Sequence, residues 1–534
     1  MLKLKTFAVW LGWLACLTCA ATANGAAAAT PKSAKPAKSA TTKPSKSPNI
    51  ILFYADDLGH GDVGSYGCKD IQTPRIDSLA SQGVRFTNYY SAAPICSPAR
   101  AALLTGRYPS RTGVPNLVSS MPNSPGLLSS EITIAKLAKS RGYVTGLVGK
   151  WHLGSVAGSE PNDHGFDEFF GTHAGCIDYY SHIFYWPPEG EAPVHDLWRN
   201  RQEIFENGHY FTDLVAREAI QFIHTHGSQK ADAPPFLLYV AFTAPHFPMM
   251  APERYMKMYA NVPDMPPERA IYAAMVTCMD DAIGQILDAL QKAKLADDTL
   301  VFFASDNGAT VEPEANFGGG SNAPFRGHKF SVFDGGSRSP AVVRWPGHVP
   351  SGQVRQQMVC AFDVFPTVAQ AIGAELPTDR TIDGIAWQPI FNDANAAGHD
   401  VLVWQHVKQY AVRQGPWKLL VKAMDTRPHH LNIEVPKEDR VFLANVETDV
   451  GEQHNVAREH PEIVDRLNAI HDAWVIDVKY PVPASAPATN PASEPASNPA
   501  SDAAMRRALM SDSPTPPAIM NTIATDVTTE TPKP

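Results

Sequence analysis

Four short apolar segments constrain the fold of this chain more than any other feature. Each is rich in β-branched and aromatic residues, and longer stretches with helical periodicity separate them. The segments cover residues 49–54, 143–148, 236–242 and 300–304. Strands that alternate with helices are typical of an α/β fold, in which helices flank a large, mostly parallel sheet. We therefore expect this fold class.

The clearest expected helix carries an apolar stripe that would face the sheet. The stripe consists of Ile271, Met275, Cys278, Ala282, Ile286 and Leu290. This position makes Cys278 a core residue. Beyond about residue 395 the pattern changes to short strands at 401–404, 410–413 and 417–421, and a helical stretch at 461–475 follows. These segments predict a smaller C-terminal α+β domain with an antiparallel sheet.

Polar residues follow each of the four apolar segments. They are Asp56 and Asp57, then Lys150 and His152, then His246, and finally Asp306 and Asn307. Ligands of open α/β sheets bind at the carboxyl ends of the strands. We therefore expect three carboxylates, one amide, one lysine and two histidines to meet at one edge of the sheet.

The acidic pair in this set indicates a metal ion. A lone Asp after a strand is usually a turn former or a helix cap, but two adjacent acids repel each other when buried unless a cation or protons compensate. Asp56, Asp57, Asp306 and Asn307 all offer oxygen ligands, which suit Ca²⁺ or Mg²⁺ better than zinc. A cation beside lysines and histidines indicates an anionic substrate. These residues predict a metal-assisted hydrolase of phosphate or sulfate esters.

A Cys-x-Pro-x-Arg motif begins at Cys96. Ser97 is the expected N-cap of a helix, Pro98 its first helical residue and Gly106 its exit. Cys96 would then lie at a helix N-terminus, where free N–H groups favour negative charge, and Arg100 would lie one turn further on. A buried or disulfide-bonded thiol is the default interpretation of a lone cysteine. The neighbouring Arg and the expected anion site favour a functional cysteine instead.

This motif, with the Thr105-Gly106-Arg107 end of its helix, closely resembles the signature of the sulfatase family. The second signature of that family, Gly-Lys-Trp-His-Leu-Gly, is matched at 149–154. Four further motifs occur in order, Asp-Asp-Leu-Gly at 56–59, Ala-Pro-His-x-Pro at 244–248, Ser-Asp-Asn-Gly at 305–308 and Phe-Arg-Gly-His-Lys at 325–329. His328 stands where relatives usually have Gly. The resemblance covers about residues 49–471 and is closest to the arylsulfatase A and N-acetylgalactosamine-6-sulfatase branch.

The resemblance implies an alkaline phosphatase-like fold, one Ca²⁺ per chain and a Cys96 that a formylglycine-generating enzyme oxidises to formylglycine. The implied calcium ligands are Asp56, Asp57, Cys96, Asp306 and Asn307. The implied catalytic residues are Cys96, Arg100, Lys150, His152, His246 and Lys329.

The implied chemistry explains why the cysteine is oxidised. An aldehyde hydrate at position 96 would carry two hydroxyl groups on one carbon. One would attack sulfur with help from Asp306 and the metal, while Lys329 and His246 protonate the departing alcohol. The second would lose a proton to His152, so that sulfate leaves and the aldehyde re-forms. A serine at this position would retain a stable sulfate ester.

The chain is expected to be exported, to the periplasm or the medium. Lys3 and Lys5 precede an apolar run at 7–17 and an Ala-Thr-Ala triplet at 21–23, which predicts a cleaved signal peptide. The run is too short to span a membrane well. The five remaining cysteines are an odd number, so at least one is unpaired or chemically changed. A net charge of −9 disfavours a nucleic-acid partner.

The expected organisation has five parts. They are a signal peptide at 1–23, a basic Lys/Ala/Ser/Pro linker at 24–48, a catalytic α/β domain at 49–394, an α+β subdomain at 395–480 and a Pro/Ala/Ser-rich tail at 481–534.

Two other functions stay open on the sequence. A phosphatase or phosphodiesterase of the same superfamily would use a Ser or Thr nucleophile and two zinc ions, and a sulfated-glycan-binding protein would leave Cys96 unoxidised. The substrate itself is expected to be a sulfated sugar, with small aryl sulfates as surrogates. Segment 171–198 is either a packed insertion or the wall on which sugar rings stack, through Tyr179, Tyr180, Phe184, Tyr185, Trp186, His173 and His182.

Overall fold

The computed structural model describes residues 47–230, 232–312, 318–427, 430–434 and 436–479. The predicted signal peptide, most of the predicted linker and the predicted tail lie outside the described residues.

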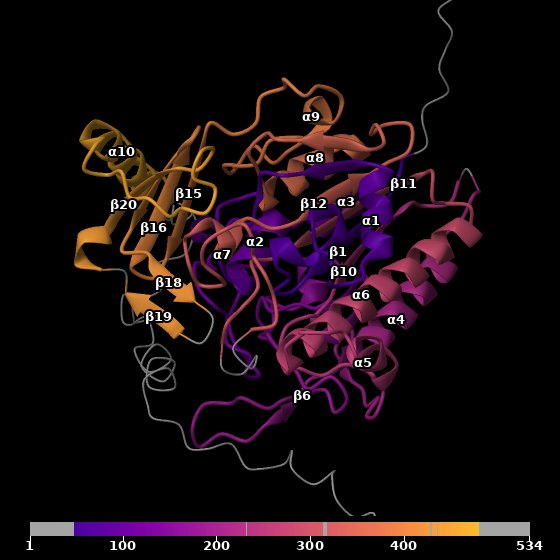
Figure 1. Ribbon diagram of the computed structural model, residues 1–534. Coiled ribbons are helices and arrows are strands. Elements are labelled where there is room, and N and C mark those ends of the chain that lie inside the picture. The colour runs from indigo at the N-terminus through magenta and orange to yellow at the C-terminus, as the bar shows by residue number, and fades with distance from the viewer. Residues whose placement is uncertain (1–46, 231, 313–317, 428–429, 435, 480–534) are drawn as a thin grey trace, which may run out of the picture. The chain divides into compact units, whose positions relative to one another are not determined.

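A mixed sheet forms the centre of the described part of the chain (Figure 1). Its ten strands there follow the order β13 (Gln353–Arg355), β2 (Val84–Phe86), β12 (Ala341–Arg344), β11 (Thr299–Ser305), β1 (Asn49–Ala55), β10 (Phe236–Ala241), β4 (Val144–Lys150), β5 (Glu168–Thr172), β8 (Trp198–Arg199) and β9 (Gln202–Glu203). The neighbours β11, β1, β10, β4 and β5 are parallel, and β12 and β8 run antiparallel beside them. The four strands predicted from the sequence are β1, β4, β10 and β11, so the α/β prediction is confirmed.

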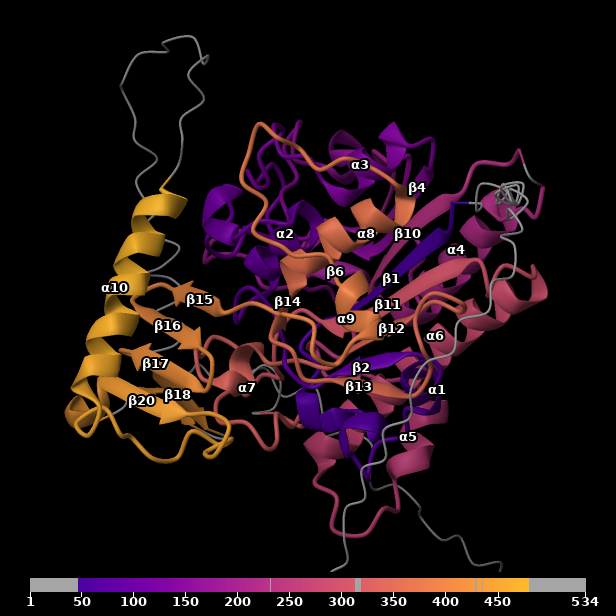
Figure 2. The ribbon, with the colours of Figure 1, turned by 90° about the horizontal axis from the view of Figure 1, so that it is seen from above.

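Both faces of the parallel strands are buried, which explains why their sequences are apolar throughout instead of alternating. Along β1, Ile51 and Phe53 join one core cluster while Ile50 and Leu52 join another, because successive side chains of a strand point to opposite faces. The first cluster includes residues of α1 (Pro74–Ser81), α4 (Phe211–His226), α5 (Glu253–Tyr259) and α6 (Pro267–Lys292). The second includes residues of α2 (Cys96–Thr105), α3 (Ile134–Ser140) and α8 (Val364–Ile372), and Figure 2 shows α8 and α6 on opposite sides of the strands.

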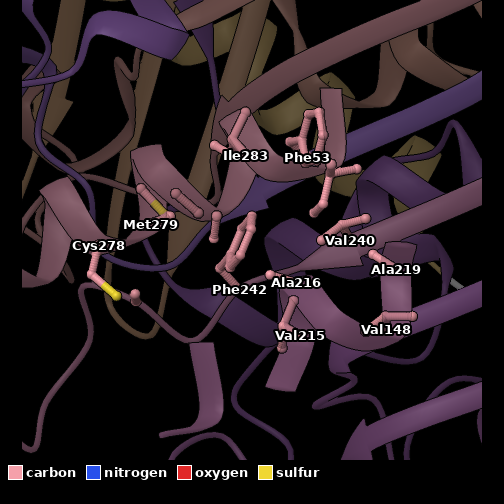
Figure 3. Packing of buried hydrophobic residues seen from close by; sticks show 14 of the residues in the cluster. Phe53, Val148, Val215, Ala216, Ala219, Val240, Phe242, Cys278, Met279 and Ile283 are labelled. Carbon is pink, nitrogen blue, oxygen red and sulfur yellow. The ribbon is translucent and has the colours of Figure 1, made fainter. Parts of the chain in front are cut away.

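Helix α6 supplies much of the first cluster. Met279 and Ile283 lie near Phe53 and Phe242 (Figure 3), and Cys278 is a buried member of the same cluster, as predicted. By length and hydropathy α6 could also cross a membrane, but 72% of its most apolar window is buried inside the protein. This burial is typical of the core helix of a folded domain.

The C-terminal part contains a four-stranded antiparallel sheet, in the order β15 (Val401–His406), β16 (Gln409–Gln414), β17 (Trp417–Val421) and β20 (Val441–Asn445). Helix α10 (Pro461–Val478) packs Ile463 and Leu467 against one face of this sheet. On the other face Trp404 meets Tyr90, with ring centroids 4.9 Å apart. The prediction of a smaller α+β domain is confirmed.

The remaining short elements connect these parts. They include β3 (Tyr89–Tyr90) paired with β14 (Val359–Cys360), β6 (Ile183–Phe184) paired with β7 (Val194–His195), β18 (Met424–Arg427) paired with β19 (His430–Glu434), and the helices α7 (Asp334–Ser337) and α9 (Gln388–Asn392). The five cysteines within the described residues are free thiols.

Candidate active site

The carboxyl ends of four parallel strands meet at one edge of the large sheet. Tyr54 at the end of β1 lies opposite Ala241 of β10 and Ala304 of β11, and Val240 of β10 lies opposite Val148 of β4. The structure thereby brings together all the predicted site residues, none of which is more than 4% exposed. They are Asp56, Asp57, Cys96, Arg100, Lys150, His152, His246, Asp306, Asn307 and Lys329.

Helix α2 starts at Cys96, one residue before the predicted cap. Ile95 is the N-cap, and the hydroxyl of Ser97 accepts a hydrogen bond from the backbone N–H of Val118 at 3.1 Å. The prediction that Ser97 caps the helix is therefore wrong. Pro98 fits inside the first turn because N–H groups there need no intrahelical acceptor. The predicted exit is confirmed, since Gly106 has a φ of 73° in the left-handed region.

The donor atoms of Asp56, Asp57, Cys96 and His246 all lie within 4.8 Å of one another. Asp56 Oδ1 and Asn307 Oδ1 are buried and have no hydrogen-bond donor. Such atoms are costly unless they are bound. Because Asp56, Asp57, Asp306 and Asn307 offer buried oxygen ligands, which Ca²⁺ prefers, the residues present fit a calcium ion.

Each acid of the site faces a cation. Lys150 Nζ donates to Asp56 Oδ2 at 2.5 Å. The Arg100 guanidinium donates to Asp306 Oδ2 at 2.7 Å, and Lys329 Nζ donates to Asp57 Oδ2 at 3.0 Å. These pairs keep a dense group of buried charges compatible with folding.

The pKa values of the three carboxyls differ because their surroundings differ. Burial raises the pKa of Asp57 to about 6 and that of Asp306 to about 7, although cations oppose the shift. At Asp56 burial acts in the same direction, but the charges of Lys150 and its cationic neighbours outweigh it and hold the pKa well below its usual range. With no metal ion bound, Asp57 and Asp306 therefore take up protons more readily than Asp56 does.

The lowered pKa values of both histidines favour their neutral forms. Burial, together with the charge of Lys150, lowers the pKa of His152, and burial with Lys329 lowers that of His246. His152 Nε2 lies 3.0 Å from the carbonyl of Val118, so Nε2 carries the proton and the buried Nδ1, which has no hydrogen-bond partner, keeps its lone pair. His246 Nδ1 lies 2.8 Å from the carbonyl of Phe247, which leaves Nε2 to accept from Lys329 Nζ at 3.1 Å.

The backbone is strained at two of these positions. Asp57 has a φ of 62° and His152 a φ of 53°, both in the left-handed region that non-glycine residues rarely adopt. Each lies two residues beyond the end of a parallel strand. Strain of this kind costs about 1–3 kcal/mol and occurs preferentially at functional sites.

The thiol of Cys96 is poorly suited to act as a thiolate. Burial raises its pKa above the ordinary value, although Lys150 and Lys329 oppose the shift. A protonated thiol is a weak nucleophile. Its burial therefore disfavours the unmodified thiol as a nucleophile.

Three contacts of the site were not predicted from the sequence. Glu312 Oε2 lies 3.4 Å from Lys329 Nζ, and the only signal for it is its place six residues after Asp306. Tyr179 is fully buried and its hydroxyl donates to the carbonyl of His246 at 2.8 Å. It therefore cannot be the sugar platform that the sequence suggested. The third contact is the Val118 carbonyl that fixes the tautomer of His152, and a backbone acceptor leaves no mark in the sequence.

Trp186 is exposed, as a side chain on which a sugar ring stacks must be. It is 39% exposed, and its ring centroid lies 5.8 Å from that of Phe247. The ring of Phe247 in turn lies 4.1 Å from the ring of His246. One exposed aromatic side chain of segment 171–198 is thus connected directly to the catalytic edge.

Comparison with known proteins gives consistent matches. The family model named Sulfatase matches residues 48–374. N-acetylgalactosamine-6-sulfatase of Rattus norvegicus is 36% identical over 389 residues, which cover 70% of this chain and 71% of that protein. Steryl-sulfatase of Rattus norvegicus is 35% identical over 423 residues, covering 65% and 71%. The crystal structure of Ps i-CgsB in complex with k-i-k-neocarrahexaose is similar with a TM-score of 0.71 and 34% identity, over 81% of this chain and 93% of that one.

Proposed function

The chain belongs to the sulfatase family and is a sulfuric ester hydrolase, and from this premise we propose that it removes sulfate from a carbohydrate by means of an oxidised Cys96 and one Ca²⁺. The observation that carries the proposal is the arrangement around Cys96. Lys150, Lys329 and His246 lie close to a buried thiol, and burial raises the pKa of that thiol. Oxidation to formylglycine supplies the nucleophile that this environment otherwise lacks.

The calcium ligands in this proposal are Asp56, Asp57, Asp306, Asn307 and the side chain at position 96. The unpartnered oxygens of Asp56 and Asn307 support this assignment. When bound, the ion neutralises the acids and polarises the oxygens of the sulfate group.

The side chains of the site divide the remaining work. Arg100 and Lys150 hold Asp306 and Asp56 in place and offer positive charge to the sulfate oxygens. His152 accepts a proton at Nδ1, which faces no other donor. Lys329 and His246, 3.1 Å apart, form the pair that delivers a proton to the departing alcohol oxygen.

Three observations support a carbohydrate as the substrate. One similar structure is described with a neocarrahexaose, and a similar enzyme is named for N-acetylgalactosamine 6-sulfate. In this chain Trp186 is exposed beside Phe247 and His246, where a sugar ring could stack on it. We further propose that the chain is exported, as its N-terminal residues predict, and that it acts on extracellular polysaccharide.

The phosphatase alternative fits the site less well. It needs Asp-His ligand pairs for a second zinc ion, whereas this chain has Asp306-Asn307 at the second pair. The oxygen ligands that Asp56, Asp57, Asp306 and Asn307 offer at this edge of the sheet also favour a hard cation over zinc.

Mass spectrometry of the active enzyme tests the proposal. The peptide spanning 92–100 should show that the thiol sulfur of Cys96 is lost and an aldehyde gained. Cys96→Ala and Cys96→Ser should both lose at least about 10³-fold in activity on 4-nitrophenyl sulfate, because neither can form the hydrate. Full activity of material that contains only unmodified cysteine would contradict the mechanism.

A further inference from the structure

Glu312 brings a fourth carboxylate to the site, and none of the assigned roles uses it. Its Oε2 lies 3.4 Å from Lys329 Nζ, on the ammonium group that also bonds Asp57 Oδ2 at 3.0 Å. Only 12% of the Glu312 side chain is exposed. Arg100 pairs with Asp306 and Lys150 pairs with Asp56. Asp57 and Glu312, in contrast, both pair with Lys329.

The surrounding segment holds this carboxylate in place. Thr310 Oγ1 donates to Glu312 Oε2 at 2.8 Å. The backbone N–H of Lys329 donates to the carbonyl of Ala309 at 3.0 Å, and the Asn322 amide bonds both the N–H and the carbonyl of Ala309. The segment that carries Glu312 and the one that carries Lys329 are therefore joined by their backbones, so the pair is preorganised.

The buried negative charge of Glu312 affects which anions bind beside Lys329. A sulfate monoester carries one negative charge, whereas a phosphate monoester of the same shape carries about two at pH 8. The second charge gains attraction from the cations but also meets the repulsion of Glu312, and this repulsion grows with ligand charge. We propose that Glu312 is a specificity-determining residue that disfavours dianionic ligands relative to monoanionic sulfate esters. This inference rests on the proposed function in one respect, namely that the anion binds beside Lys329.

The first test measures binding without turnover. Sulfamate and inorganic sulfate have nearly the same shape, but sulfamate carries one charge and sulfate two. Their dissociation constants are measured by calorimetry on the full chain and on Glu312→Gln, Glu312→Asp and the exposed control Glu253→Gln. By Coulomb's law at the effective dielectric constant of such sites, removing one unit charge near the bound anion changes the affinity by on the order of tenfold. Glu312→Gln should therefore improve sulfate relative to sulfamate by about tenfold, while Glu312→Asp and Glu253→Gln leave the ratio unchanged.

The second test uses the same variants in turnover. The ratio of kcat/KM for 4-nitrophenyl phosphate to that for 4-nitrophenyl sulfate at pH 8 should rise about tenfold in Glu312→Gln only. If Glu312 merely positions Lys329, both substrates lose rate together and the ratio stays constant, which overturns the proposal. An unchanged ratio of sulfate to sulfamate affinity, or no binding of either ion, overturns it as well. Failure of the unaltered enzyme to hydrolyse any sulfate ester would instead contradict the proposed function. The ratio of sulfate to sulfamate affinity would still test the role of Glu312.

Discussion

Asp57 shows how one residue serves several demands of the site. Its left-handed backbone turns the chain at the end of β1, and its carboxylate bonds both Lys329 and the Asn307 amide, the latter at 2.6 Å. Burial raises the pKa of this carboxyl. Without a metal ion, the backbone of Asp57 is strained and its buried charge is unfavourable. A metal ion that binds this carboxylate therefore adds most to the stability of the folded protein.

Calcium affinity should consequently depend on pH. The carboxyls of Asp57 and Asp306, with pKa values raised to about 6 and about 7, take up protons as the pH falls, and calcium must displace them. We expect the affinity measured by calorimetry to fall at least about tenfold between pH 7.5 and pH 5.5. Asp57→Asn should bind calcium more weakly and with a shallower pH dependence, because one titrating ligand is gone. An affinity that is constant over this range would contradict the assignment of these carboxyls as ligands.

At the scale of elements, the strands account for what could be predicted from the sequence. The sequence places Asp56, Lys150 and Asp306 at one edge because each lies at or directly after the end of a buried apolar strand, and parallel strands end at one edge. His246 follows the end of β10 by five residues. Contacts between loop segments that are far apart in the sequence produce no such pattern in the sequence. Glu312 contacts Lys329 because two loop segments are joined by the Asn322 amide and by the backbone hydrogen bond from Lys329 to Ala309.

The aromatic segment 171–198 shows a different limit. Composition predicted a sugar platform but could not separate Tyr179, which is fully buried under His246, from Trp186, which is exposed. Burial depends on the partners that other elements supply, here the ring of Tyr210 stacked 5.0 Å from that of Tyr179. The two residues therefore have separate roles.

Substitutions of these two aromatic residues should have distinct effects. Trp186→Ala should raise KM about five- to tenfold for a sulfated oligosaccharide and little for 4-nitrophenyl sulfate, since only the sugar reaches the indole. Tyr179→Phe removes the hydroxyl that holds the His246 carbonyl, so it should lower kcat for both substrates alike. Phe205→Ala, which removes an exposed ring packed on His195, is the control and should change neither. Equal effects of Trp186→Ala on both substrates would show that the segment is only structural.

At the scale of the whole described molecule, the C-terminal sheet supports the active site. Gln409 of β16 donates to the carbonyl of Phe330 at 2.6 Å, and Ser331 donates to the carbonyl of Met424 at 2.6 Å. Both contacts hold the backbone directly after Lys329. A buried ion cluster lies beside them, in which Lys418 Nζ contacts Asp334 at 2.6 Å and Glu452 at 3.0 Å. Folding of the smaller sheet and placement of Lys329 are thus physically coupled.

Loss of the Lys418 charge should therefore affect both stability and catalysis. Lys418→Met keeps most of the side-chain volume but leaves the fully buried acids Asp334 and Glu452 with less compensation, a change that typically costs about 3–5 kcal/mol. The midpoint of thermal unfolding should fall by several degrees. At temperatures below this transition, kcat on 4-nitrophenyl sulfate should also fall, because the segment that carries Lys329 loosens. The matched control Lys257→Met breaks an exposed pair on α5 and should leave both quantities nearly unchanged. A destabilised Lys418→Met enzyme with an unaltered kcat would show that the smaller sheet stabilises the fold without positioning Lys329.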